Sequence, residues 1–434
     1  MRLSSVLFAI LFGGGLSGAA QGLEAPADGR LTLDEAKRYA IANNYELAAL
    51  KKAVEETDAA KGKEAAAFYP SLGVAGGLDT QLTRSGSTTI PLAYVYAEWN
   101  IFNGFRDINK LNAADREAAT ARVQLEKAKF RVGLEVESAF HAYLFHRGSL
   151  AVQSEALKLN AEHRKMARRR KNSGLATEAD VMEFDIARSL LESEMVSLTQ
   201  KLDAARIELK RLLGREVGRE LEPVGSLQHQ HVEGDLMSYL DRIQAESERV
   251  QVKKLAVEKA EYERKATNSA WLPEIALQAH AGYETLHERT TNSPDVSAMI
   301  VGKFDIFSGF GDVSERRQKT ARLMKEEALL KQAILDAITG TEKAYRELKA
   351  IQERVDLEEA NEDRTKGFYK TTVSEYNRGV KNSSDVRNAA EMYANAIFRE
   401  QRYKYDFLVA KLNLERIIGY PVKTVLIEAH EHAH

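Results

Sequence analysis

The hexapeptide NIFNGF at residues 100–105 has a second copy in the chain, DIFSGF at residues 305–310. Each copy places a glycine between two phenylalanines, which suits a sharp corner because glycine adopts backbone angles barred to other residues. The copies lie 205 positions apart (305 − 100) in a chain of 434 residues. The spacing raises the possibility that the whole chain is written twice.

The hexapeptides belong to a longer internal repeat. At the same shift of 205 (379 − 174), glycines, aromatic residues and Asp-Val pairs coincide, without a gap, over more than a hundred residues: Trp99 with Phe304, Gly174 with Gly379, Asp180-Val181 with Asp385-Val386, and Gly214 with Gly419. Upstream the shift is 203 (273 − 70), where Phe68 meets Trp271 and Pro70 meets Pro273. Chance does not hold one register for so long, so the chain is a tandem duplication.

Composition favours long helices over compact α/β modules. The chain has only 7 Pro and 29% charged residues, with Ala, Glu, Lys, Leu and Arg dense throughout. It has no Cys, which excludes disulfides and thiolate metal sites. The net charge of −2, with both signs interspersed, argues against a nucleic-acid partner.

The N-terminus reads as an export signal. Residues 1–20 hold Arg2, an apolar run and small residues ending near Ala20, and they are too short to remain as a membrane-spanning helix. A buried N-terminal helix is the alternative. A linker follows at residues 21–30. No later stretch reaches about 18 apolar residues, so an exported protein with only a β-barrel route into a membrane is expected.

The same plan is predicted for both repeats, which span residues 31–214 and 235–419. Each begins with a helix (about 31–68 and 235–270) that stops before Pro70 or Pro273, because the residue before proline disfavours helix. A β-hairpin follows, at about 71–101 and 274–306, with polar loops at 83–89 and 287–295. Residues 215–234 are a connector, and residues 420–434 form a His-rich tail.

The predicted strands alternate in the manner of a transmembrane barrel. One face carries apolar side chains and the other small or polar ones: Leu72, Val74, Leu78 and Leu82 oppose Gly73, Ala75, Asp79 and Gln81. A soluble hairpin that covers a core is the alternative. Trp99, Gly104, Phe304 and Gly309 mark the joints between the strands and the helices, where aromatic residues suit a membrane interface.

Two very long helices leave these joints, over about 106–171 and 311–377. The second shows a 4-3 apolar spacing typical of supercoiled helices, over Leu330, Ile334, Ala337, Thr341, Ala344, Leu348, Ile351 and Val355. Shorter helices return over about 176–213 and 381–418. Gly174 and Gly379 reverse the chain between them, and Thr177 and Ser383 or Ser384 are expected to cap the returning helices.

Together these motifs resemble the outer-membrane efflux proteins, the TolC-like channels. The match covers nearly the whole mature chain and includes LTLDEAKRYAIANNYEL and the paired FYPSL and WLPEI. It also includes the two tips, which are the turns between outgoing and returning helices at residues 172–181 and 377–386. The resemblance implies a mainly α fold with a transmembrane β part. It further implies a homotrimer whose twelve-stranded barrel lies in outer-membrane lipid and continues as an α-helical barrel across the periplasm. Its partners would be a periplasmic adaptor and an inner-membrane pump of the RND or ABC type.

The resemblance also assigns roles to the tips. Adaptor docking falls on Gly174, Leu175, Thr177, Gly379 and Val380. A periplasmic gate with acidic rings falls on Asp180, Glu183, Tyr376, Lys381, Asp385 and Asn388. Some relatives place a second Asp where this chain has Asn388 beside Arg387, which leaves the cation preference of the pore open.

Enzyme chemistry finds no support, and no cofactor is expected. The 10 His are scattered along the chain, and no Ser-His-Asp order, phosphate-binding loop or pair of residues at metal-ligand spacing stands out. The tail EAHEHAH is the exception, where His430, His432 and His434 could bind a metal ion and His229 and His231 in the connector could join them. Three hypotheses remain: a duct for drugs or metal ions, the same duct for protein secretion, and a periplasmic coiled-coil scaffold without a pore.

Overall fold

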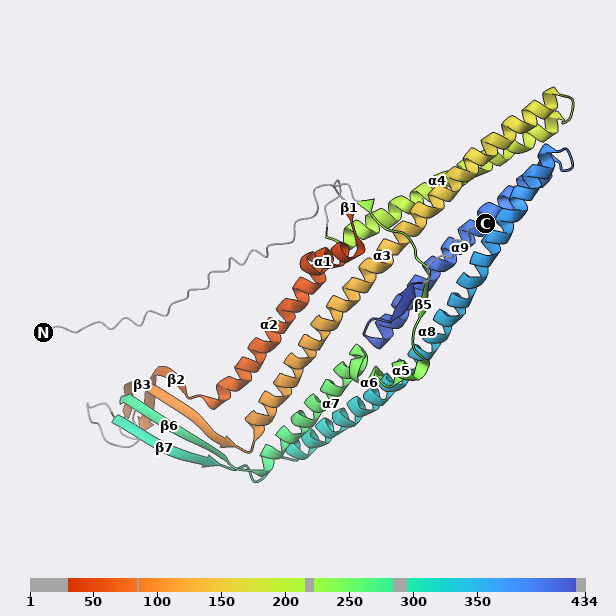
Figure 1. The fold of residues 1–434 in the computed structure, drawn as a ribbon. Helices are drawn as coiled ribbons and strands as arrows, with labels where there is room; N and C mark the ends of the chain where they lie inside the picture. Colours follow the sequence, from red (N-terminus) through yellow and green to blue (C-terminus); the bar gives the residue numbers. More distant parts are fainter. Residues whose placement is uncertain (1–29, 84–85, 215–221, 284–294, 427–434) are drawn as a thin grey trace.

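The computed structural model describes residues 30–83, 86–214, 222–283 and 295–426. The molecule is elongated, with a β-sheet at one end and two helical hairpins reaching to the other (Figure 1). The predicted export signal at residues 1–20 and the tail histidines His430, His432 and His434 lie outside the described residues and stay predictions.

The elements follow the same order in both halves. The first half contains β1 (Arg30–Leu31), α1 (Leu33–Asn43), α2 (Tyr45–Ala65), the 3₁₀ helix η1 (Ala66–Phe68), β2 (Ser71–Thr83), β3 (Gly86–Asn103), α3 (Arg106–Asn172) and α4 (Glu178–Leu212). The connector adds β4 (Glu222–Pro223) and β5 (Gln230–Val232). The second half contains α5 (Leu236–Leu240), α6 (Ile243–Glu246), α7 (Glu248–Ala266), η2 (Thr267–Trp271), β6 (Glu274–Tyr283), β7 (Asp295–Lys303), α8 (Gly311–Asn377), α9 (Ser383–Ile418) and β8 (Thr424–Leu426).

The first helix of each half is broken, which corrects the expectation of one continuous helix. Thr32 and Glu35 form a capping box at the start of α1, and the Asn44 side chain accepts from the Leu47 N–H to start α2. Asparagine is a strong N-cap, so Asn44 ends one helix and begins the next. In the second half the same segment is divided into α5, α6 and α7.

The four long strands form one antiparallel sheet in the order β2-β3-β6-β7. The predicted apolar face is continuous across it, because Val74 lies opposite Val95, Val95 opposite Ala281, and Ala281 opposite Val296. Its large side chains are exposed, as 81% for Val74 and 82% for Val296 illustrate. Such a face, in a chain this charged, needs an apolar neighbour.

Two strand limits differ from the expectation. The loop expected at residues 83–89 is shorter, because β2 extends to Thr83 and β3 begins at Gly86. β7 ends at Lys303 rather than near residue 306, whereas β3 continues to Asn103. β3 lies between two strands and is held on both sides, while β7 is an edge strand in the single chain.

The internal repeat reaches the level of strand register. Ser71 lies opposite Glu98 in the first hairpin, and Glu274 lies opposite Lys303 in the second. These four residues are related by the two shifts found in the sequence, 203 (274 − 71) and 205 (303 − 98). The two hairpins therefore pair their strands in equivalent register.

Both joints use two consecutive residues in the left-handed backbone region. Gly104 and Phe105 have φ of 65°, and Gly309 and Phe310 have φ of 65° and 63°. A non-glycine residue there is strained by about 1–2 kcal/mol. In each copy the second phenylalanine meets the first edge-on, at 5.2 Å between the ring centroids of Phe102 and Phe105. The aromatic pair explains why the motif keeps phenylalanine at both places.

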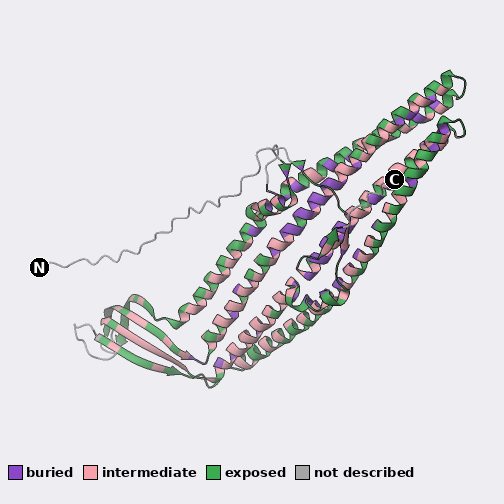
Figure 2. Cartoon of the chain, in the orientation of Figure 1, coloured by how far each residue is buried: buried purple, intermediate pink, exposed green. Residues whose placement is uncertain are grey.

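The core lies midway along the helices, where the connector crosses them (Figure 2). The predicted 4-3 seam of α8 is buried or half-buried along its length, and Leu348 is completely buried. α3 carries the larger buried set, because it packs against α2, α4, α7 and α9. The α3 position equivalent to Ile334 of this seam (334 − 205) is the polar Lys129, which pairs with Glu126 at 2.6 Å.

The described parts of the connector and of the C-terminal segment form short strands. β1 pairs with β4 in parallel, and β5 pairs antiparallel with β8. Three residues of the stretch expected to be a tail, Thr424–Leu426, are therefore a strand. Among the described helices, none combines the length and apolar content that crossing a membrane requires.

Candidate functional site

The ends of the two helical hairpins are built in the same way. At the first, Leu175 N–H donates to the Arg170 carbonyl at 2.8 Å and Gly174 N–H to Lys171 at 2.9 Å. Val380 and Gly379 repeat both bonds with Glu375 and Tyr376 at the second tip. These two bonds form the Schellman motif, which ends a helix when the residue after the C-cap has left-handed backbone angles. Gly174 and Gly379 are that residue at the two tips, with φ of 72° and 83°.

Capping boxes start the two returning helices. Thr177 accepts from the Asp180 N–H, and the Asp180 carboxylate accepts from the Thr177 N–H at 2.7 Å. Asn382 and Asp385 do the same at 2.9 and 3.0 Å. The predicted cap at Thr177 is confirmed, and the one at Ser383 or Ser384 is wrong. Asn382 is the N-cap instead, because Asp385 lies three residues after it and completes a capping box with it.

These caps fix the two aspartates predicted for the gate. Hydrogen bonds from the backbone and then the hydroxyl of Thr177 hold the pKa of Asp180 below its ordinary value, with a smaller contribution from the Ser383 hydroxyl. Asp180 thus stays ionised while it orders its helix. A charge at these positions is held by the backbone rather than free to move.

The turns themselves present apolar side chains to the surroundings. Leu175 is 70% exposed and Val380 is 71% exposed, each directly after the left-handed glycine. Both residues belong to the turns between α3 and α4 and between α8 and α9, which lie at the end of the molecule away from the sheet (Figure 1). Two exposed apolar side chains at equivalent positions suit a partner protein that has small hydrophobic pockets to receive them.

A cluster around Tyr376 joins the two hairpins. The Arg170 guanidinium of α3 lies over the Tyr376 ring of α8, 4.4 Å from its centroid, and Arg170 also donates to the Tyr376 carbonyl. The Tyr376 hydroxyl is 3.3 Å from the Ser383 hydroxyl of α9. Tyr376 is 1% exposed. It therefore acts between helices and not as an open lining residue in this conformation.

Further contacts cross between the hairpins. His163 of α3 lies 2.8 Å from the Tyr369 hydroxyl of α8, and burial lowers the pKa of this histidine. Arg387 of α9 lies 3.9 Å from Glu183 of α4. Glu183 is thus brought to the inter-hairpin contact, while Lys381 is half-buried and Asn388 exposed at the tip.

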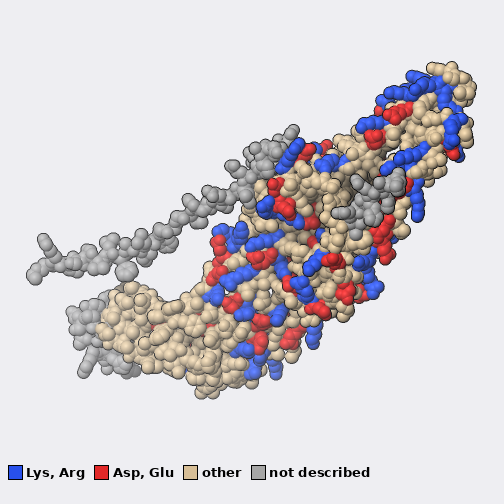
Figure 3. All heavy atoms as spheres, viewed as in Figure 1, with Lys and Arg blue, Asp and Glu red and all other residues tan. Residues whose placement is uncertain are grey.

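Lys and Arg gather near the tips on the face shown in Figure 3. The last turn of α3 carries Arg169, Arg170 and Lys171, and Lys171 pairs with Glu178 of α4. Sequence reasoning missed Arg170, whose importance arises only from its contact 206 positions away along the chain. The run RRRK at residues 168–171 was the available signal, although it does not identify which arginine turns inward.

Comparisons with known proteins agree with this architecture. The model of the outer membrane efflux protein family matches residues 38–215 and 239–420, one segment in each half. The alkaline protease secretion protein AprF of Pseudomonas aeruginosa is 23% identical over 286 residues, which are 63% of this chain and 60% of that relative. The chain thus matches less than two thirds of the length of this curated relative.

Solved structures share the fold at low sequence identity. The outer membrane protein VceC of Vibrio cholerae superposes with a TM-score of 0.76 at 14% identity, covering 90% of this chain and 96% of that one. A membrane protein from Pseudomonas aeruginosa gives 0.77 at 18% identity, covering 90% of both chains. Since the family model matches most of the sequence in both halves, the chain belongs to the outer membrane efflux protein family.

Proposed function

We propose that this chain is the outer-membrane exit duct of a tripartite efflux or secretion system. It works as a homotrimer with a periplasmic adaptor and an inner-membrane pump of the RND or ABC type. The observation that carries the proposal is the sheet, whose apolar face continues over four strands while both edge strands, β2 and β7, pair on one side only among the described residues. Unpaired edges beside an apolar face call for closure on further copies.

The internal repeat supplies the rule for that closure. Within the chain, the first half packs on the second through β3 on β6, α3 on α7 and α3 on α9. The equivalent elements of the second half are β7 and α8. By the same rule, β7 pairs with β2 of the next copy, and α8 packs on its α2 and α4. Three copies give a closed sheet of twelve strands.

The surfaces that this rule brings together are apolar and exposed in one chain. α4 presents Met182, Ile186 and Leu190, each more than half exposed, at one-turn spacing. α8 presents Leu335, Leu357 and Phe368, also more than half exposed. Burying such side chains is worth roughly 1–2 kcal/mol each, more than surface ion pairs supply.

The charge distribution supports a membrane position for the sheet. Figure 3 shows Lys, Arg, Asp and Glu spread over the helical part and nearly none on the visible face of the sheet. Trp99 and Phe304, 42% and 54% exposed, lie where the sheet meets the helices. Aromatic residues favour that boundary between lipid and water. The sheet therefore sits in the outer membrane, and the helices extend into the periplasm.

The tips serve as the gate and the adaptor-docking end. The contact of Tyr376 with Arg170 holds the two hairpins of a subunit together, while its contact with Ser383 joins α8 to α9 within the second hairpin; in a trimer both contacts recur three times around the axis. Separating the hairpins breaks the Arg170 contact and widens the end. The side chains of Leu175 and Val380, beside Gly174 and Gly379, contact the adaptor. Thr177 shapes the turn, and Lys381 and Asn388 line its rim.

Protein export is the second candidate for the cargo. The relative AprF is by its name a secretion protein for an alkaline protease. The duct geometry is common to both uses, because the pump selects the cargo.

The experiment that tests the duct uses purified protein in planar lipid bilayers. Stepwise ion conductance from a detergent-extracted trimer supports a pore, whereas a soluble monomer without conductance supports the scaffold instead.

A further inference from the structure

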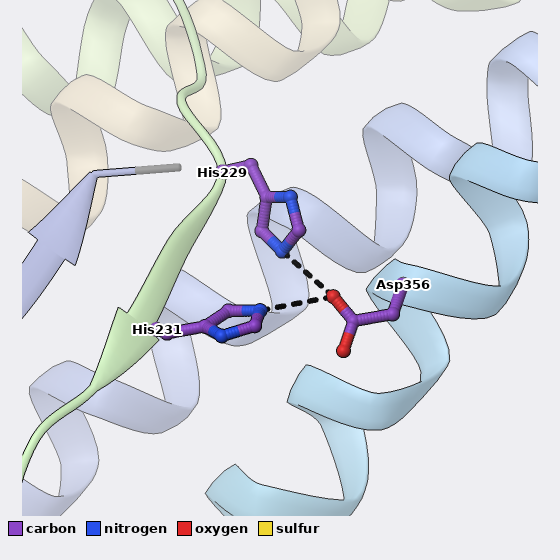
Figure 4. Close-up of side chains that lie close together, drawn as sticks. All are labelled: His229, His231 and Asp356. Atoms are coloured by element: carbon purple, nitrogen blue, oxygen red, sulfur yellow. Dashed lines mark hydrogen bonds and ion pairs between the residues drawn. The ribbon is translucent and has the colours of Figure 1, made fainter. Parts of the chain in front are cut away.

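Two histidines and an aspartate from separate parts of the chain converge beside the middle of α8. His229 precedes β5, His231 lies in β5, and Asp356 lies on α8 (Figure 4). Nε2 of His229 and Nε2 of His231 are each 3.0 Å from the same Asp356 oxygen, Oδ1. One ligand atom from each of the three residues lies within 4.8 Å of the others. The connector and a long helix thus share a small set of nitrogen and oxygen donors.

His229 is buried with its hydrogen-bonding capacity unused. The residue is 9% exposed, and neither ring nitrogen makes a hydrogen bond of acceptable direction with a described residue. Oxygens of Asp356 and Glu359 nevertheless lie 3.0 and 2.9 Å away from its two nitrogens. A buried polar group without a directed bond is costly. A cation between the imidazoles and the carboxylate removes that cost.

The spacing fits a tetrahedral metal ion. Zinc bonds of about 2.0–2.2 Å to nitrogen and oxygen place two ligand atoms roughly 3.3 Å apart. The observed 3.0 Å from each nitrogen to Oδ1 needs a change of only a few tenths of an ångström. Two imidazoles with a carboxylate suit zinc and its neighbours, whereas magnesium and calcium prefer oxygen donors alone.

The surrounding charges also favour a divalent cation. Glu359 faces Nδ1 of His229, the position from which a carboxylate orients a metal-binding imidazole. Lys404 pairs with Glu359 at 2.8 Å and also with Glu400. Within this contacting set three carboxylates (Asp356, Glu359 and Glu400) face one lysine, so two negative charges remain when both histidines are neutral. A divalent ion balances them.

We propose that His229, His231 and Asp356 bind a divalent transition-metal ion, with zinc as the reference ion, and that it fastens the connector to α8. Gln352 and Lys349 of α8 already bond the backbone of Val232 at 3.0 and 3.2 Å, so the metal completes an existing attachment. β5 in turn carries β8, which extends the clip to the C-terminal strand. The role is structural and independent of the cargo.

The His-rich tail is a separate potential zinc binder and must be removed in the test. The described chain ends at Leu426, whose pairing partner Gln230 lies between the two histidines. A variant truncated after Leu426 keeps β8 and removes His430, His432 and His434. Full-length and truncated proteins, stripped with a chelator and purified in detergent, are titrated with zinc chloride by calorimetry.

The truncated protein is expected to bind one zinc ion per chain, and its thermal midpoint rises with zinc. His231→Gln and Asp356→Asn in that background each weaken affinity more than tenfold. Asp363→Asn, an exposed aspartate further along α8, leaves it unchanged. Cobalt loading should give the intense visible bands of a four-coordinate site in the truncated protein and not in His229→Gln. Zinc binding that disappears on truncation, or that His231→Gln and Asp356→Asn leave intact, overturns the proposal.

Discussion

The guanidinium of Arg170 lies 4.4 Å from the centroid of the Tyr376 ring, and this contact joins α3 of the first half to α8 of the second. Arg170 also donates to the carbonyl of Tyr376, so one side chain makes both a cation–π and a hydrogen-bonded contact. Together these are worth roughly 1–3 kcal/mol in a buried setting. The hairpins are thereby biased toward staying together.

Arg170→Ala should shift the tips toward a wider state. Losing roughly 1–3 kcal/mol raises the population of separated hairpins about 5- to 150-fold, because each 1.4 kcal/mol is a factor of ten. Single-channel recordings are expected to show larger or more frequent open levels. Arg169→Ala is the matched control, since Arg169 is exposed in the same turn. Equal behaviour of the two variants would remove Arg170 from the gate.

Asp385→Asn should raise single-channel conductance and weaken block by divalent cations. The amide keeps an oxygen that can accept the Asn382 N–H, so the helix cap survives while three charges per trimer disappear. An acidic ring attracts and retains divalent ions, and its loss frees the pore. Asp406→Asn, far along α9, is the control. Unchanged conductance and block would show that Asp385 only caps its helix.

Glu137 makes stability dependent on acid. Burial raises its pKa, but the hydrogen bond from His141, together with the charge and hydrogen bond of Lys37, outweighs burial and lowers the pKa from 4.5 to about 2. Because the folded value lies below the unfolded one, the contribution is full above pH 4.5. It falls away as pH drops from there through about 2. The shift corresponds to roughly 3 kcal/mol.

Glu137→Gln is expected to lower the apparent free energy of unfolding at pH 7 and to flatten its decline between pH 5 and pH 3. Urea titrations followed by circular dichroism at each pH measure both effects. Glu135→Gln, exposed two residues earlier on α3, should leave the profile as in the original protein. A profile for Glu137→Gln that is as steep as the original would assign the acid sensitivity to other groups.

The glycines of the two joints test the repeat rule. A Cβ on Gly104 would lie 2.7 Å from the Ser269 backbone, whereas a Cβ on Gly309 meets nothing within 4 Å in the single chain. The shift of 203 places Ala66 of the next copy where Ser269 stands (269 − 203). We therefore expect Gly104→Ala and Gly309→Ala to lower trimer yield similarly, measured as heat-modifiable trimer on gels.

Gly302→Ala serves as the control for these variants, because Gly302 has no positive φ and the equivalent position in the first half (302 − 205) already carries alanine, Ala97. A Gly309→Ala protein that assembles much better than Gly104→Ala would mean that no second copy occupies that position. The backbone cost of about 1–2 kcal/mol for a left-handed alanine applies to both and cannot separate them.

Much of the fold was predictable because its signals are local. Pro70 and Pro273 ended helices, alternation identified the strands, and Gly104, Gly174, Gly309 and Gly379 marked the corners at which the backbone is left-handed. The break at Asn44 and the cap at Asn382 were missed although asparagine is a good cap. At Asn382 the neighbouring Ser383 and Ser384 are equally good caps, so the local competition was close.

The contacts that matter at the site were less predictable because they join distant segments. Arg170 meets Tyr376 and His163 meets Tyr369 across 206 positions each, and nothing near either residue announces its partner. His229 and His231 stood out as a pair in the connector. Their carboxylate, Asp356, is one of many acids on α8 and emerges only when β5 is laid on that helix.

The most direct measurement of the trimer proposal is a designed disulfide between copies. The pairing of Val95 with Ala281 inside the chain maps, by 205 and 203, onto Ile300 of one copy opposite Leu78 of the next. Directly opposite residues of antiparallel strands have Cα atoms about 4.5–5.5 Å apart, within the range of about 4.4–6.8 Å that a disulfide spans. The native chain has no cysteine to interfere.

Outer membranes containing the Leu78→Cys/Ile300→Cys protein are oxidised and analysed on non-reducing gels. The expected result is a covalent trimer that a reducing agent converts to monomer. The Leu82→Cys/Ile300→Cys protein, whose cysteines are four residues out of register, should stay largely monomeric. A Leu78→Cys/Ile300→Cys protein that reaches the membrane and remains monomeric, or links no better than the out-of-register pair, would contradict the closed twelve-stranded sheet on which the duct depends.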